Sequence, residues 1–134
     1  MGIAVSLTFC DDAAETVPWR TDGKPFHWLV GELQRLYEQG AKASTGLGLS
    51  REDVRRLTWV DYSAWGEEVV FPRNCQDPMD LERALIKLLS VLSRIFRLGG
   101  RPDLLDVLAL AVEDAVLVCK SAHELGKLVA WLGS

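Results

Sequence analysis

The sequence lacks the features that mark several large classes of protein. Its three cysteines, Cys10, Cys75 and Cys119, are odd in number and far apart, whereas small secreted scaffolds carry an even and denser set. No apolar run approaches the roughly 18 residues that a membrane-spanning helix needs, and residues 1–10 lack the basic start of a signal peptide. We therefore expect a cytoplasmic protein with reduced thiols and no contact with a membrane.

An excess of basic residues is also missing. The chain has 19 acidic and 15 basic side chains, which gives a net charge of −4. Proteins that bind the phosphate backbone of nucleic acids usually carry a basic surface. The composition therefore argues against a nucleic acid partner and favours a partner with a basic surface.

The composition is otherwise that of one compact domain. The 134 residues are 49% hydrophobic and 25% charged, which is close to the average for soluble globular proteins. A chain of this length can bury a core of ordinary size but has little room for two domains. With no internal repeat and no long linker, we expect a single domain that spans residues 1–134.

The first half of the chain predicts strands and short helices. Apolar residues alternate with small or polar ones over residues 3–10, which indicates a half-buried strand. We expect a loop over residues 11–24, an amphipathic helix over residues 25–39, and a short helix that begins after Ser50 and ends near Leu57. Ser50 and Asp53 have the spacing of a capping box. Further short strands are expected near residues 57–61 and 67–71.

The second half predicts an antiparallel helical hairpin. Pro78 can occupy the first position of a helix over about residues 78–98, and glycines separate it from a second helix over about residues 102–120. The second helix is apolar almost all round, which predicts a central position in the core. Ser121 and Glu124 form a capping box, so we expect a last helix that contains Leu128 and Val129.

These elements predict an α+β fold in which helices dominate. The expected architecture has four to five helices, including the central hairpin, and a small sheet of two or three strands. The alternative is an all-α bundle in which the N-terminal strand is merely an extended arm.

One side of the first hairpin helix carries a basic stripe. Its residues follow one another at helical spacing: Arg83, Lys87, Ser90, Arg94 and Arg97. Antiparallel packing would bring the stripe close to acids of the second helix, namely Asp103, Asp106 and Glu113. We expect these charges to neutralise one another within the hairpin; the alternative is that the stripe is a binding face for an acidic partner or for RNA.

No motif in the chain identifies a catalytic centre. Cys119 and His123 are spaced as a ligand pair, but a structural zinc site needs two further soft ligands. Asp11 and Asp12 follow a predicted strand, without the additional carboxylates that usually accompany a magnesium site. The glycines between residues 40 and 48 do not match a phosphate-binding loop. We therefore expect no metal, no cofactor and no enzymatic activity.

The best candidate site is a segment in which large aromatic residues alternate with acids. It contains Trp59, Asp61, Tyr62, Trp65, Glu67 and Glu68. Aromatic anchors are typical of protein-binding hot spots, and surrounding acids select a basic partner. The alternative is that the tryptophans only fix the segment to the core. A second candidate surface is formed by Trp28, Glu32 and Arg35, which share the polar side of the helix over residues 25–39.

These observations lead to a class-level prediction of function. We expect a non-enzymatic, intracellular bacterial protein-binding domain, monomeric or homodimeric, that occludes a basic protein partner, as an immunity protein or antitoxin neutralises a toxin. One alternative is an acidic secretion chaperone or adaptor. A second alternative is a metal-dependent enzyme that uses the carboxylates of Asp11, Asp12, Glu67 and Glu68.

Overall fold

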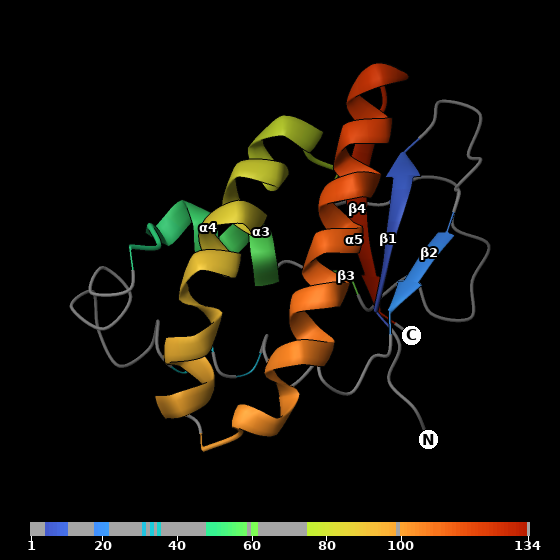
Figure 1. Ribbon diagram of the computed structural model, residues 1–134. Helices are drawn as coiled ribbons and strands as arrows, with labels where there is room; N and C mark the ends of the chain where they lie inside the picture. Colours follow the sequence, from blue (N-terminus) through green and yellow to red (C-terminus); the bar gives the residue numbers. More distant parts are fainter. Residues whose placement is uncertain are drawn as a thin grey trace.

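The fold combines a small sheet with a helical hairpin. The computed structural model describes residues 5–10, 18–21, 31, 33, 35, 48–58, 60–61, 75–98 and 100–133. The elements in chain order are β1 (Val5–Cys10), β2 (Pro18–Thr21), α3 (Arg51–Thr58), β3 (Val60–Asp61), α4 (Pro78–Leu98), a short 3₁₀ helix η1 (Pro102–Leu104), α5 (Leu105–Glu124) and β4 (Leu128–Gly133). Figure 1 shows α4 and α5 side by side in front of the strands.

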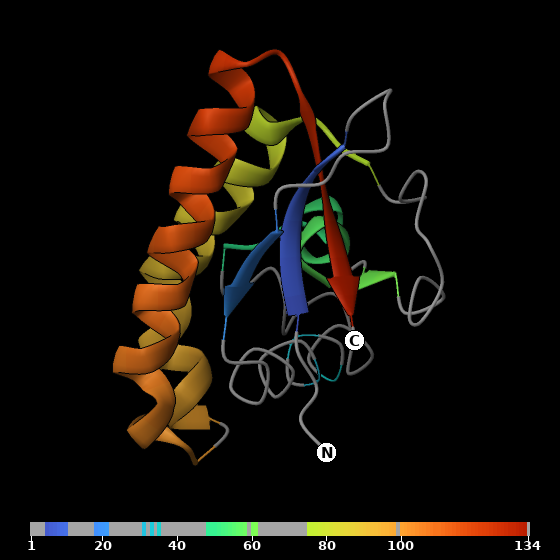
Figure 2. The same cartoon turned by 90° about the vertical axis from the view of Figure 1, so that its right-hand side faces the viewer.

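The sheet has the strand order β2-β1-β4-β3. Strand β1 is antiparallel to both of its neighbours, β2 and β4, whereas the short β3 runs parallel to β4. Figure 2 shows that the hairpin of α4 and α5 forms a separate layer along one side of the sheet. Helix α3 packs against α4. The architecture is therefore two layers with the core between them.

The core is filled from the inner face of the sheet and the inner sides of the helices. Leu7 is paired with Trp131, and Phe9 is paired with Val129, so these four side chains point to the same face of the sheet. All four belong to one buried cluster with residues of α3, α4 and α5. Trp131 is fully buried, and its indole nitrogen donates a hydrogen bond of 2.9 Å to the carbonyl oxygen of Arg56 in α3.

Local signals in the sequence explain where the two long helices begin and end. Asp77 accepts a hydrogen bond of 2.8 Å from the backbone N–H of Met79, and Pro78 occupies the first helical position, where no N–H is needed. Gly100 follows α4 with φ 70°, and Gly126 follows α5 with φ 67°. Both glycines adopt a left-handed conformation that closes the last turn, a role to which glycine is suited.

The expected helix-rich α+β fold with an antiparallel helical pair is confirmed. Helix α4 has the expected bounds, and α3 begins at the expected Ser50–Asp53 capping box. Residues 31, 33 and 35 are helical, as the helix over residues 25–39 requires. The first strand is a paired member of the sheet, so the alternative of an all-α bundle with an extended arm is wrong.

Three expectations for the sheet and its neighbours are corrected. Within the described residues the sheet already has four strands instead of two or three. The expected loop over residues 11–24 contains strand β2. This strand begins with Pro18, which is tolerated there because β2 is at the edge of the sheet. The expected last helix is absent: α5 continues through Ser121 to Glu124, and residues 128–133 form β4. The strand expected at residues 67–71 lies outside the described residues.

Replacement of Leu108 by alanine tests this core. Leu108 is completely buried in α5, whereas Leu110 on the same helix is 64% exposed. Leu108→Ala should lower the free energy of unfolding by about 2–5 kcal/mol, because it leaves a cavity between the helical layer and the sheet. Leu110→Ala removes the same atoms from a solvated position and should cost less than about 1 kcal/mol. A larger loss for Leu110→Ala than for Leu108→Ala in denaturant melts would show that α5 is turned the other way.

Candidate functional site

The segment of acids and aromatic residues falls largely outside the described residues. Val60 and Asp61 form β3, which pairs with Trp131 and Leu132. Trp59 and residues 62–74 are not described, and neither is the side chain of Asp61. The binding role predicted for Trp59, Asp61, Tyr62, Trp65, Glu67 and Glu68 therefore stays a prediction.

The second candidate surface is described at one of its three residues. Arg35 is exposed on a helical backbone, and Leu33 nearby is buried, which agrees with an amphipathic helix at this position. Trp28 and Glu32 lie outside the described residues. The binding role predicted for these three residues therefore stays a prediction.

The expected pairing of the basic stripe across the hairpin is wrong for Lys87, Arg83 and Asp103, which have other partners. Lys87 binds Asp53 of α3 at 3.0 Å, and Arg83 lies 3.4 Å from Asp80 of its own helix. Asp103, an expected acceptor, instead binds Arg101 at 3.1 Å. Lys87 thus lies on the side of α4 that faces α3. Because α4 is apolar on three sides, the sequence pattern did not fix the rotation of this helix. Across the hairpin, Glu82 lies 3.9 Å from Lys120.

The Lys87–Asp53 pair is joined to the start of α3. The Asp53 carboxylate accepts a hydrogen bond of 3.0 Å from the backbone N–H of Ser50, and the Ser50 hydroxyl accepts one of 3.1 Å from the N–H of Asp53. Burial alone would raise the pKa of Asp53, but the hydrogen bonds from Ser50 and Lys87 outweigh it and hold this pKa below its usual range. The interactions among Ser50, Asp53 and Lys87 fix α3 to α4 and have a structural role. We call these three residues the Asp53 joint.

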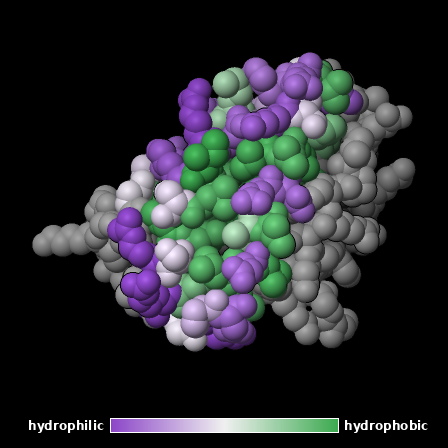
Figure 3. Space-filling view, viewed as in Figure 1, coloured by the Kyte–Doolittle hydropathy of each residue, from purple (hydrophilic) through white to green (hydrophobic). Residues whose placement is uncertain are grey.

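The outer side of α5 exposes large apolar side chains. Val107, Leu110 and Leu117 are 48%, 64% and 60% exposed, and their spacing places them on one side of the helix. Ile86 on α4 is 51% exposed, and the Glu82–Lys120 contact places it level with Leu117. Figure 3 shows a continuous band of hydrophobic residues on this side of the molecule, bordered by hydrophilic ones.

Acidic side chains surround the exposed leucines. Glu113 and Asp114 are exposed and lie between Leu110 and Leu117 along α5, and Asp106 is exposed one turn before Leu110. We call these three acids, together with Val107, Leu110 and Leu117, the α5 face. Figure 3 looks onto the side of the molecule where α5 lies in front of the sheet (Figure 1). Large apolar groups ringed by charge are a frequent property of protein-binding surfaces.

The expected central position of the second hairpin helix is wrong, and the α5 face was therefore not predicted. That helix is covered by the sheet and α4 on only part of its circumference, and its remaining apolar residues face the solvent. A signal was present in the sequence: a pair of adjacent acids lies between two leucines seven residues apart, and such a pair is rarely buried.

A shallow pocket lies between the end of α3 and the start of α4. It has a volume of about 280 Å³ and is lined by Glu52, Arg55, Arg56, Cys75, Gln76, Asp77 and Asp80. Arg56 donates to the Gln76 side chain at 3.3 Å and lies 3.5 Å from both Glu52 and Asp80. Since its guanidinium is shared among these neighbours, the pocket offers a ligand few unused interactions.

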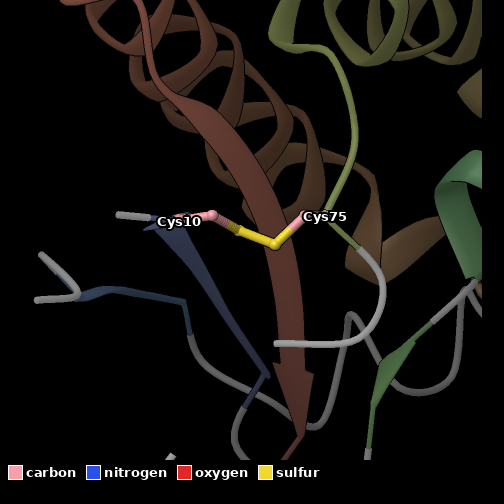
Figure 4. The surroundings of a disulfide bond; sticks show 2 residues. All are labelled: Cys10 and Cys75. Carbon is pink, nitrogen blue, oxygen red and sulfur yellow. A yellow bond between two sulfur atoms is a disulfide. The ribbon is translucent and has the colours of Figure 1, made fainter. Parts of the chain in front are cut away.

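A disulfide between Cys10 and Cys75 borders this pocket (Figure 4). Cys10 ends β1 on one side of β4, and Gln76, the neighbour of Cys75, forms two backbone hydrogen bonds with Val129 on the other side. The disulfide therefore connects two segments across the central strand. The expectation of reduced thiols is wrong for this pair, because the fold brings together two cysteines that are 65 residues apart in the sequence.

The remaining cysteine has the properties of a core residue. Cys119 is buried, and burial together with the negative charge of Glu82 raises the pKa of its thiol to about 12. Such a thiol does not ionise near neutral pH, so it is a poor nucleophile. Among the described residues, no group of three or more histidine, cysteine or acidic side chains could hold a metal ion. None of the described helices is both long and apolar enough to cross a membrane.

The Asp53 joint makes stability depend on pH. Because the pKa of Asp53 is lowered on folding, the carboxylate stabilises the fold above its unfolded pKa, and this contribution is lost as the pH falls through the folded pKa. Asp53→Asn should lower stability at neutral pH and flatten the loss of stability between about pH 5 and pH 2. Asp114→Asn removes a similar charge from an exposed site and should lower stability at neutral pH less than Asp53→Asn does.

Removal of the disulfide should destabilise the fold. The double variant Cys10→Ser/Cys75→Ser loses a link that closes a long loop, and its free energy of unfolding should fall by about 2–5 kcal/mol. A reductant should lower the stability of the wild type and leave that of the variant unchanged. Denatured, unreduced wild-type protein should react with one equivalent of an alkylating agent, at Cys119. Three equivalents by mass spectrometry would show that the bond is absent.

The chain was compared with protein families, curated proteins and solved structures. No family model, no curated protein and no solved structure matches this chain. Among the described residues, the α5 face combines large exposed apolar side chains with exposed acids.

Proposed function

We propose that this protein is a non-enzymatic protein-binding domain that occludes a basic protein partner, in the way that an immunity protein or antitoxin covers a toxin. The observation that carries the proposal is the α5 face, where three large apolar side chains are exposed among three acids. The proposal concerns a class of function, since it depends on the physical character of a surface.

The two components of the α5 face would contribute to binding in different ways. Leu110 and Leu117 expose most of their side chains to water, and covering them with a partner would supply the hydrophobic part of the binding energy. Asp106, Glu113 and Asp114 would attract a basic surface and increase the rate of association. Lys120 does not cancel these acids, because it lies beside Glu82.

The cytoplasmic location also remains a proposal, and the Cys10–Cys75 disulfide is the observation against it. Structural disulfides persist in oxidising compartments and are rare in the reducing cytosol. A partner that is met in an oxidising compartment is equally compatible with the α5 face. The alkylation experiment on protein isolated from its natural source distinguishes the two locations, because it reports the redox state in which the protein is found.

An acidic secretion chaperone or adaptor is a second candidate, because such a protein also needs an exposed apolar surface. The α5 face and Ile86 provide one. A chaperone of this kind is typically dimeric, so light scattering separates the two candidates: a stable dimer would favour the chaperone.

The third reading, a metal-dependent enzyme, depends on Asp11, Asp12, Glu67 and Glu68. All four residues lie outside the described part of the chain, and no observation on the described residues favours this reading.

Capture with matched baits tests the proposed function. We would immobilise the wild type, the double variant Leu110→Ala/Leu117→Ala and the control Leu128→Ala, in which an exposed leucine of β4 is shortened. We would identify the partner as a protein that binds the wild type and the control but does not bind the double variant. Purified, it should be basic, and its affinity should fall as salt is raised from about 0.05 M to 0.5 M. Each α5 truncation should cost about 2 kcal/mol of binding energy in calorimetry.

The activity of the captured protein decides whether binding means occlusion. If it is a toxin or another active protein, its activity should be lost in a one-to-one complex and retained when the double variant is added. The proposal is contradicted if the captured protein is acidic, or if every protein captured by the wild type is also captured by the double variant.

A further inference from the structure

We propose that the α5 face binds an amphipathic helix of the partner, whose apolar residues recur every seven positions and are flanked by lysine or arginine. This inference rests on the proposed function and specifies the part of the partner that is recognised. It follows from the spacing of the exposed leucines, the positions of the acids beside them, and the unfavourable contact of the face with a second copy of itself.

The spacing of Leu110 and Leu117 fits a helix and does not fit a strand. Seven residues of α-helix span about 10.5 Å, which is also the distance between equivalent apolar residues of a partner helix with a seven-residue repeat. Side chains on one face of a strand recur at about 6.8 Å or 13.6 Å. A strand laid along α5 would therefore match one leucine and miss the other.

The acids lie where the flanking residues of a helical pair usually interact. Glu113 and Asp114 are on opposite sides of the line that joins Leu110 to Leu117, because adjacent residues of a helix differ by about 100° in direction. In paired helices, residues that border the apolar line on either side form ion pairs with the partner and select its charge. Acids on both borders select a helix with basic residues on both borders.

A second copy of this chain is a poor occupant of the α5 face. Glu113 and Asp114 occupy the midpoint between Leu110 and Leu117. A symmetric dimer formed about that midpoint would bring two copies of each acid together on a surface that excludes water. Like charges in such positions oppose association, so the face is suited to a different chain.

Two bases of α4, Lys87 and Arg83, are engaged by acids outside the α5 face. Lys87 is bound to Asp53 and therefore lies on the side of α4 that faces α3. Arg83 belongs to the same stripe and contacts Asp80. The contacts of Lys87 and Arg83 are therefore made on the side of α4 that is turned away from α5.

Designed peptides of about 21 residues test the proposal. The first has leucine at a seven-residue repeat with lysine flanks, and the second has the same leucines with glutamate flanks. The third has the composition of the first in an alternating, strand-like order. Only the first should bind the ¹⁵N-labelled protein, with amide shifts confined to α5 and the outer side of α4. Leu110→Ala should weaken its binding about tenfold.

Charge reversal provides the matched control. Asp114→Lys should weaken the lysine-flanked peptide about fivefold at low salt and strengthen the glutamate-flanked one. Glu52→Lys makes a similar change on α3, where the side chain is 59% exposed, and should change neither affinity. The proposal is overturned if the strand-like peptide binds equally well, or if Asp114→Lys and Glu52→Lys behave alike.

The result can be separated from the test of function. If the helical peptide fails while a basic protein is captured in a manner that depends on Leu110 and Leu117, the function stands and helix recognition is wrong. If the peptide binds but no protein depends on these leucines, the occlusion function is wrong instead. A dimer that dissociates in Leu110→Asp, observed by analytical ultracentrifugation, would assign the face to a second copy and overturn the proposed partner.

Discussion

The position of β4 in the middle of the sheet is the constraint on which the rest of the structure depends. Its residues Val129, Ala130 and Trp131 are fully buried. One edge of β4 pairs with β1, and the other is shared by β3 and Gln76. The indole of Trp131 needs an acceptor in the core and finds it at the end of α3, so a single strand positions the sheet, α3 and the start of α4. The α5 face is what remains exposed once the inner side of the hairpin covers this strand.

Much of the helical architecture could be predicted because it is specified locally. Pro78 and the glycines after Leu98 fix both ends of α4, and the Ser50–Asp53 pair fixes the start of α3. Such signals act between residues a few positions apart, so they are visible in a single sequence. The side of each helix that faces its neighbours was harder to predict. Helix α4 is apolar on three sides, so its rotation is decided by packing.

The features that the sequence did not predict depend on distant residues. Strand β4 is buried on both faces, so its apolar residues form a run without alternation, and Leu128, Val129 and Leu132 also match helical spacing. Helix α5 does not end at Ser121, as the capping box had suggested. It continues to Glu124, and Gly126 closes it in a left-handed conformation. The pairing of Cys10 with Cys75 requires the fold itself, since three cysteines allow three pairings. The acid and aromatic segment remains a prediction, because it lies outside the described residues.

The strand order of the sheet also has a consequence for synthesis on the ribosome. Val5 pairs with Gly133, and β4 is translated after every other described strand. One edge of β1 therefore cannot pair with β4 while the intervening chain is still being made. In contrast, α4 and α5 are adjacent in sequence and can associate early. Until β4 is released, the nascent chain exposes the surfaces that will become its core. Completion of the sheet is thus a late event, and until then the apolar surface and the unpaired edge of β1 make the growing polypeptide prone to aggregation.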